Sequence, residues 1–173
     1  YLTNKKTARL YSFSLYKTAW CQLRQGKYQQ AVDNLERVIR LGDSQQAAAE
    51  GIKEVNSIRL KEEAIKDYVA FYSQTGKYEE SQADFYKATG SEKQTLELLE
   101  ALAYRYSYSG NINASTYLFK KLIAHDTEAE KAAKYQYQIV QDFLNVNHVK
   151  KFKSELTHWI EKYGPKSEWA VQN

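Results

Sequence analysis

Few side chains in this sequence have the types and the spacing that catalysis or metal binding needs. The three histidines, His125, His148 and His158, have no second histidine or cysteine at a metal-ligand spacing. Cys21 is the only cysteine, and no motif pairs it with a histidine as a nucleophile and its base. We therefore interpret the histidines as turn or surface residues, and Cys21 as a small apolar side chain that a helix buries.

Other motifs that carry chemistry are absent or ambiguous. No glycine-rich phosphate loop follows a strand pattern. The acidic pairs Glu62-Glu63 and Glu79-Glu80 consist of adjacent residues, which point in different directions on a helix, so a solvated face explains them. The basic run Lys150-Lys151-Phe152-Lys153 reads as the exposed half of an amphipathic helix, with contact to an anionic surface as the alternative. The sequence therefore predicts a protein that is not an enzyme and that has no cofactor and no metal.

The composition favours a helical chain. Its 173 residues include one proline and seven glycines, whereas an all-β fold needs many more turn residues. No stretch approaches the roughly 18 apolar residues of a membrane span, so we expect none. The net charge of +4 arises from 25 basic and 21 acidic residues that are interspersed. A nucleic-acid binder more often shows a basic stripe, so we expect no nucleic-acid partner. Since the chain contains no methionine, we interpret it as a segment of a longer or processed protein.

Glycines recur between amphipathic patterns at a spacing typical of helical repeats. Gly26, Gly76 and Gly110 each follow one amphipathic pattern and precede another, and the interval from Gly76 to Gly110 is 34 residues. Such an interval is the period of a helix-turn-helix repeat. Asn147 occupies the corresponding position at the next turn, where asparagine tolerates left-handed backbone angles. A repeat array of this kind indicates a binding surface and not a reaction centre.

Apolar periodicity places the individual helices. The predicted helices span residues 4–25, 28–41, 78–89, 92–109, 112–125, 128–146 and 149–163. In the last of them the expected buried stripe is Phe152, Leu156, Trp159 and Ile160. For the stretch from Asp43 to Thr75 we favour one long helix, and the alternative is a break near Asn56–Ser57.

These helices group into repeat units within a single domain that covers residues 1–173. The predicted units span about residues 11–43, 62–90, 96–125 and 133–165, with a helical insertion at 44–61. The insertion follows from the interval between Gly26 and Gly76, which at 50 residues is about half a repeat too long.

The residues at matched positions of the units resemble the tetratricopeptide repeat (TPR). Its pattern combines a large apolar residue, a small residue, a turn glycine, an aromatic residue and an alanine. The first three units supply Leu15, Ala19, Gly26, Tyr28, Ala31, Leu35 and Val38; then Ile65, Val69, Gly76, Tyr78, Ser81, Phe85 and Ala88; then Leu99, Ala103, Gly110, Ile112, Ser115, Phe119 and Leu122. The resemblance implies an all-α, TPR-like α-α superhelix of about four units, with a long or extra helix between units one and two.

A narrower resemblance concerns location. Segments 16–21, 26–31, 60–68 and 163–170 are similar to repeats in cell-envelope proteins of gliding and predatory bacteria. This resemblance implies a protein of the bacterial periplasm or one anchored to the outer membrane.

The first helix of each repeat pair is expected to line a concave groove. On that face the sequence is rich in aromatic residues, the types that dominate interface hot spots, and not merely polar. The predicted partner-binding residues are Phe13, Tyr16, Trp20, Arg24, Lys66, Tyr104, Tyr108, Tyr137 and Gln141. The alternative for Tyr16 and Trp20 is that they pack beneath the long helix of unit two.

The favoured function is therefore a scaffold that binds a segment of another protein in an aromatic-lined groove. A second hypothesis is an accessory helical domain of a cell-envelope enzyme or assembly whose catalytic part lies outside this segment. Nucleic-acid binding and self-association through end units without polar caps are the remaining hypotheses.

Overall fold

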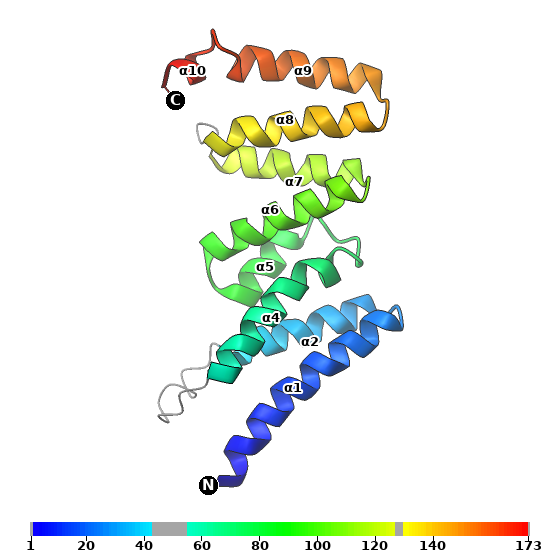
Figure 1. The fold of residues 1–173 in the computed structure, drawn as a ribbon, viewed down its shortest axis with the longest axis vertical. Coiled ribbons are helices and arrows are strands. Elements are labelled where there is room, and N and C mark those ends of the chain that lie inside the picture. Colours follow the sequence, from blue (N-terminus) through cyan, green and yellow to red (C-terminus); the bar gives the residue numbers. More distant parts are fainter. Residues whose placement is uncertain (1, 43–54, 127–129, 173) are drawn as a thin grey trace. The chain divides into compact units, whose positions relative to one another are not determined.

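The computed structural model describes residues 2–42, 55–126 and 130–172, and all regular secondary structure in these ranges is α-helical. The helices are α1 (Leu2–Arg24), α2 (Tyr28–Gly42), α4 (Val55–Tyr72), α5 (Ser81–Thr89), α6 (Glu92–Tyr108), α7 (Ile112–His125), α8 (Glu130–Asn145), α9 (Val149–Tyr163) and α10 (Glu168–Gln172) (Figure 1). The all-α class expected from the sequence is confirmed. The chain forms two compact units, Tyr1–Thr95 and Leu96–Asn173, and each is described by itself.

Helix boundaries agree with the sequence where a strong turn residue marks them. Helices α7 and α9 have the predicted bounds, whereas α5 begins at Ser81 and not at Tyr78. At that end the Ser81 hydroxyl donates to the Tyr78 carbonyl at 2.7 Å, so residues 78–80 form a turn. The short helix α10 was not predicted, and it is capped by the Ser167 hydroxyl, which accepts a hydrogen bond from the Ala170 backbone at 3.1 Å.

The structure describes only the second part of residues 43–75. Helix α4 begins at Val55, directly before Asn56–Ser57, so both the single long helix and the break near Asn56–Ser57 stay predictions. The helix ends at Tyr72, because the backbone N–H groups of Ser73, Gln74 and Thr75 complete a terminal turn. The first part of the predicted long helix, residues 43–54, lies outside the described residues, and the unit boundaries stay predictions.

Three of the turns share one hydrogen-bond pattern. Gly26, Gly110 and Asn147 have positive φ angles of 73°, 78° and 55°. In each case the turn residue and its successor donate back to carbonyls at the end of the preceding helix, over 2.9–3.0 Å at Gly26 and Asn147 and up to 3.1 Å at Gly110. This pattern is the Schellman motif, which satisfies carbonyls that a helix end leaves without partners. These three turns therefore have the same local structure.

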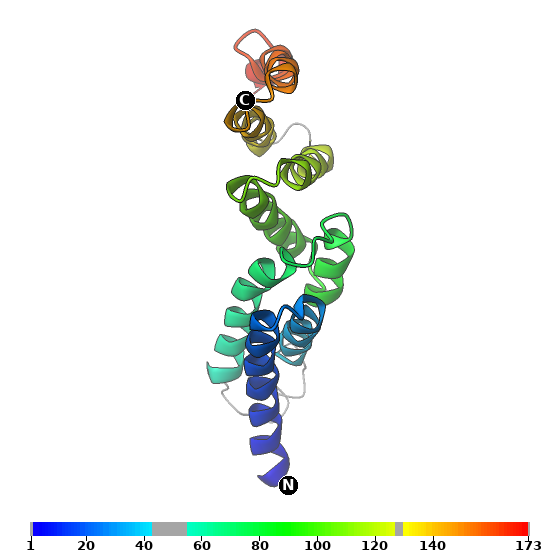
Figure 2. The same ribbon diagram turned by 90° about the vertical axis from the view of Figure 1, so that its right-hand side faces the viewer.

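The first unit is built from neighbouring helices with small residues at their contacts. Helices α1 and α2 lie side by side (Figures 1 and 2), and α2 also packs against α4 and α5. Ala19, Ala31 and Ala64 are fully buried, as the repeat pattern requires at close helix contacts. Large rings fill the remaining space: the ring of Phe85 lies 5.2 Å from that of Tyr68 and 4.8 Å from that of Tyr72.

The second unit continues the same architecture. Helix α8 packs against both α7 and α9, and its core includes Leu102, Leu118, Phe119 and Ile139. One predicted core position is wrong: Ile160 is 54% exposed, and Phe152, Leu156 and Trp159 are only partly buried. The physical reason is that α9 contacts α8 on one side, where the carboxylate of Glu155 is buried, and leaves Ile160 on the other.

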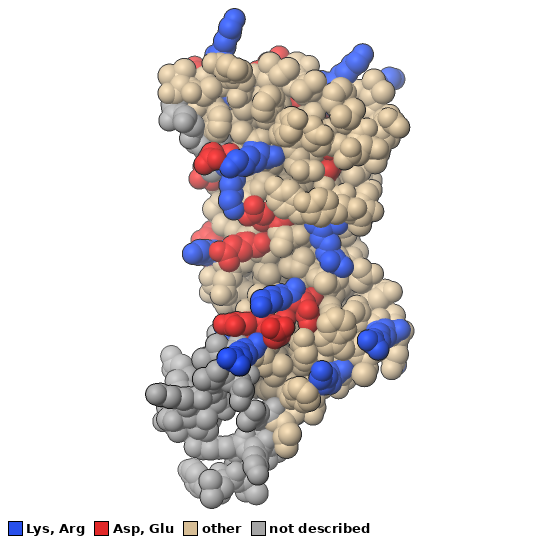
Figure 3. Space-filling view, in the orientation of Figure 1, with Lys and Arg blue, Asp and Glu red and all other residues tan. Residues whose placement is uncertain are grey.

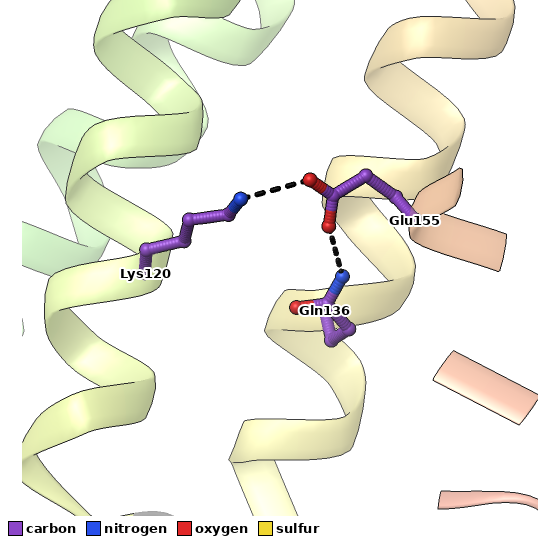
Figure 4. A network of polar contacts seen from close by, with 3 residues as sticks. All are labelled: Lys120, Gln136 and Glu155. Atoms are coloured by element: carbon purple, nitrogen blue, oxygen red, sulfur yellow. Dashed lines mark hydrogen bonds and ion pairs between the residues drawn. The ribbon is translucent and has the colours of Figure 1, made fainter. Parts of the chain in front are cut away.

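Two buried acidic residues each join three helices in the second unit. The Asp142 carboxylate accepts hydrogen bonds from the hydroxyls of Ser107 at 2.6 Å and Ser115 at 2.7 Å. The Glu155 carboxylate accepts from the Lys120 ammonium at 2.8 Å and the Gln136 amide at 2.7 Å (Figure 4). Burial on its own raises the pKa of Glu155, but these two donors outweigh it, so that the pKa lies below its ordinary value.

Replacing Gly110 by alanine is expected to destabilise the protein by about 1 kcal/mol. A Cβ at Gly110 has nothing within 4 Å, so the cost comes from the positive φ and not from a clash. Gly110→Asn serves as the matched control and is expected to cost less, because Asn147 already occupies an equivalent turn. Urea unfolding measures both variants; equal stability of Gly110→Ala and the wild type would contradict this explanation.

The Glu155 network is expected to make stability depend on pH. Because the folded-state pKa of Glu155 is lowered, its stabilisation is present above the ordinary glutamate pKa and is lost as pH falls through the folded-state pKa. Near pH 7, Glu155→Gln is expected to be less stable than the wild type by on the order of 1 kcal/mol. The difference, followed by urea unfolding, should shrink in acid; a difference that is constant with pH would count against the ionised carboxylate.

Candidate functional site

Residue types that could carry chemistry are not assembled into a reactive centre in the described part of the chain. No group of three or more His, Cys, Asp or Glu side chains among the described residues is arranged to hold a metal ion. Cys21 is exposed, so its interpretation as a buried apolar side chain is wrong. The reason is its position two residues after Ala19, which points it away from the buried face of α1. Among the described helices, none has the length and hydropathy to cross a bilayer.

Glu36 on α2 is a buried acid of the first unit with a shifted pKa. Burial raises its pKa above the ordinary value, although the Tyr68 hydroxyl of α4 donates to its carboxylate at 2.8 Å and opposes the rise. Burial also raises the pKa of Tyr68, with Glu36 adding to the effect. A shifted acid in a cleft is a catalytic candidate, but this pair is packed inside the helical core. We therefore assign it to the cohesion of α2 and α4.

The predicted partner-binding residues of α1 fall into an exposed group and an inward group. Phe13 and Arg24 are exposed, and the Lys17 ammonium lies 5.2 Å from the ring of Phe13 and 5.8 Å from that of Tyr16. Cations and aromatic faces attract one another at such distances. Lys17, which the sequence reasoning did not single out, therefore contacts both the exposed ring of Phe13 and the partly buried ring of Tyr16.

Tyr16 and Trp20 are partly buried because both contact α4. The Tyr16 hydroxyl donates to the Asp67 carboxylate at 2.6 Å, and burial followed by Asp67 raises the Tyr16 pKa. The ring of Trp20 meets that of Phe71 edge-on at 5.0 Å. Both contacts agree with the alternative in which these side chains pack against the long helix. Their role in partner binding stays a prediction, as does that of Lys66, which is exposed on α4 and forms an ion pair with Glu63 at 3.7 Å.

In the second unit the structure gathers two predicted residues into one surface feature. The rings of Tyr104 and Tyr108 on α6 stack with their centres 6.2 Å apart, and Tyr108 is 83% exposed. The Glu100 carboxylate of α6 pairs with the Lys131 ammonium of α8 at 2.7 Å. We call this surface the tyrosine patch; its members are Tyr104, Tyr108, Glu100, Lys131 and Lys134.

Electrostatics confirm that the members of the tyrosine patch are neighbours. Burial raises the pKa of Tyr104, Glu100 and Tyr108 add to the rise, and Lys131 and Lys134 oppose it. Lys134 also pairs with Glu130 at 2.5 Å. The positive charges of the patch are thus largely compensated by carboxylates, and its most exposed element is the phenol ring of Tyr108.

Two further predicted residues lie on α8. Tyr137 is exposed, and its ring lies 5.4 Å from that of Trp159 on α9, whose indole N–H donates to the Ala133 carbonyl at 3.0 Å. Gln141, one turn further along α8, is partly buried. The ring of Tyr137 therefore contacts α9, whereas Tyr104 and Tyr108 contact each other.

Sequence reasoning missed Lys131 as a member of this surface. The signal available was its position one turn before Lys134 at the start of a predicted helix, which places both on neighbouring parts of one face. Its partner Glu100 is 31 residues away in sequence, a separation over which periodicity gives no pairing. In the face shown in Figure 3, acidic and basic side chains lie next to one another, in keeping with charges interspersed along the chain.

Comparison with known proteins supports the repeat assignment over part of the chain. The family model for the tetratricopeptide repeat matches residues 13–44. This match covers the greater part of α1 and all of α2, so that hairpin is similar to a TPR unit. No curated protein matches the sequence.

Glu36 is expected to oppose stability at neutral pH. Its folded-state pKa is raised, so the protonated carboxyl group is favoured in the folded protein. Its contribution to stability is fully present below the ordinary glutamate pKa and is lost as pH rises through the folded-state pKa. Glu36→Gln keeps an acceptor for Tyr68 and cannot ionise, so it should exceed wild-type stability near pH 7 by up to about 1 kcal/mol.

Urea unfolding between about pH 4 and pH 8 tests this expectation. The stability advantage of Glu36→Gln over the wild type should vanish at the acidic end. Glu155→Gln differs in sign, because it is expected to be less stable than the wild type near pH 7 and to approach it in acid. As a control, Tyr68→Phe removes the donor and leaves Glu36 buried without it, at a cost of about 1–2 kcal/mol. Loss of stability in Glu36→Gln at every pH would show that the carboxylate itself is required.

Proposed function

We propose that this chain is a protein–protein interaction module that holds a segment of another protein against its exposed aromatic side chains. Its helical hairpins and the TPR match over residues 13–44 support this class of function, because such hairpins present side chains of their first helices for binding. The partner we infer is an extended or helical segment with apolar anchors.

The observation that carries the proposal is the exposure of Tyr108. An aromatic ring that is 83% exposed gains little from the fold, yet this one is held by stacking on Tyr104. Tyr104 in turn packs edge-on against the buried ring of Phe119 at 5.0 Å. The Tyr108 ring is thereby supported from the core, which lowers the entropy cost of contact with a partner.

Paired charges beside the rings add directional contacts. Lys131 and Lys134 keep their ammonium groups near the tyrosines, and their carboxylate partners Glu100 and Glu130 prevent a strong net field. A partner segment would therefore be held mainly by aromatic contact, with hydrogen bonds at the rim.

The first unit offers a second surface of similar chemistry. Phe13 and Arg24 on α1 and Lys66 on α4 are exposed, and the partly buried rings of Tyr16 and Trp20 lie along the same helix. We infer that these residues contact a partner as well. For such a module we propose a location in the bacterial periplasm or at the outer membrane, as the sequence alone led us to expect.

Removing the exposed ring is expected to weaken partner binding without affecting the fold. Peptides selected from a random display library on the wild-type protein should bind Tyr108→Ala about tenfold or more weakly, as hot-spot aromatics do. Fluorescence anisotropy with the selected peptides gives the affinities.

Tyr86→Ala is the matched control, because Tyr86 is 56% exposed on α5, the second helix of its hairpin. Its affinities should equal those of the wild type. Selected peptides that bind Tyr108→Ala and the wild type equally would exclude the tyrosine patch as the binding surface.

A further inference from the structure

The turn between α8 and α9 carries apolar side chains that the described helices leave exposed. Leu144, Val146 and Val149 are 46%, 47% and 57% exposed. The left-handed Asn147 closes the turn: its backbone N–H donates to the Leu144 carbonyl, and that of His148 donates to the Phe143 carbonyl. The apolar side chains therefore project from a short, well-defined loop.

Positive charge is concentrated directly beside these apolar side chains. Lys150, Lys151 and Lys153 are all exposed in the first two turns of α9. Between residues 143 and 154 there is no acidic residue, so the segment carries three positive charges and no negative one. The flanking acids, Asp142 and Glu155, are buried and already accept hydrogen bonds within the fold.

The rest of α9 extends this surface. Ile160 is exposed, and eleven residues correspond to about three helical turns, so Ile160 and Val149 lie on one face of α9. Lys153 lies between them on nearly the same face. Glu161, the exposed acid of this helix, lies eight residues beyond Lys153. In Figure 3, Lys and Arg side chains project outward from the region of α9.

The combination of features selects one kind of partner. Lysines alone would suit any polyanion, and apolar side chains alone would suit a protein surface. An anionic lipid bilayer accepts both, because apolar side chains enter the headgroup region while lysines remain with the lipid phosphates.

We propose that the basic tip, defined as Leu144, Val146, Val149, Lys150, Lys151 and Lys153, docks this protein on the surface of a bilayer that contains anionic lipid. The charge complementarity of three uncompensated lysines with anionic headgroups provides the attraction, and the three apolar side chains provide the preference for lipid over other polyanions. The residues of the basic tip are different from those of the tyrosine patch.

Vesicle co-sedimentation tests the proposal. The protein is expected to bind vesicles that contain phosphatidylglycerol and not vesicles of phosphatidylcholine alone, and binding should weaken as salt rises to about 0.15 M. Changing Lys150, Lys151 and Lys153 to glutamine should lower the partition coefficient by about a hundredfold. No binding to the anionic vesicles at low salt would overturn the proposal.

The matched control changes Lys27, Lys77 and Lys93, which are exposed elsewhere, to glutamine. It alters the net charge by the same amount and should bind like the wild type. An equal loss in this control would show that overall charge drives binding, and would overturn a site at the tip.

A second variant separates a bilayer from a nucleic acid. Val146→Ser with Val149→Ser removes apolar surface and keeps every lysine, so vesicle binding should fall by roughly tenfold while retention on a single-stranded oligonucleotide stays unchanged. Wild-type protein that is retained on the oligonucleotide but not on anionic vesicles would assign the tip to nucleic acid instead. Circular dichroism of each variant confirms that the helices are intact.

Discussion

Close packing between neighbouring helices is the constraint on which the rest of the structure depends. A helical hairpin cannot bury its apolar face alone, so each hairpin needs a neighbour at short distance. Within the first unit this distance is possible because Ala19, Ala31 and Ala64 are small and fully buried. Small side chains leave gaps beside the contacts, and large rings such as Phe85 and Tyr68 fill them. Tyr68 and Tyr72 therefore have a structural role in the core of this unit.

Buried carboxylates add a second constraint, which concerns register. Apolar packing tolerates small sliding of one helix against another, but a buried acid that receives donors from two other helices does not. Asp142 receives them from α6 and α7, and Glu155 from α7 and α8. Their loss would leave donors buried without acceptors, which costs more than the bond itself contributes. Glu36 is also buried between helices. Its raised pKa reflects this burial and gives no reason to infer catalysis.

The sequence predicted local features well and long-range ones poorly. The ends of α7 and α9 follow from Gly110, Asn147 and Gly164, because turn chemistry acts over a few residues. The contact between Tyr16 and Asp67 spans 51 residues, and the one between Glu100 and Lys131 spans 31, so no periodicity reports them. The exposure of a side chain also depends on which neighbouring helix covers it. Ile160 has the spacing of a core residue, yet α8 packs on the opposite side of α9. The tyrosine patch was therefore predicted only in part, as Tyr104 and Tyr108 on one helix, without its members on α8.

The tyrosine patch and the basic tip differ in how their charges are arranged. This difference predicts a different dependence on salt for the two proposed binding functions. In the tyrosine patch Lys131 and Lys134 are paired with Glu100 and Glu130, so added salt changes little and the contact area of Tyr108 dominates. At the basic tip three lysines stand in a segment without acidic residues, so attraction is long-ranged and sensitive to salt. A partner segment and a charged surface would thus be distinguished by ionic strength alone. The patch lies on α6 and α8 and the tip at the turn from α8 into α9, so helix α8 contributes to both proposed surfaces.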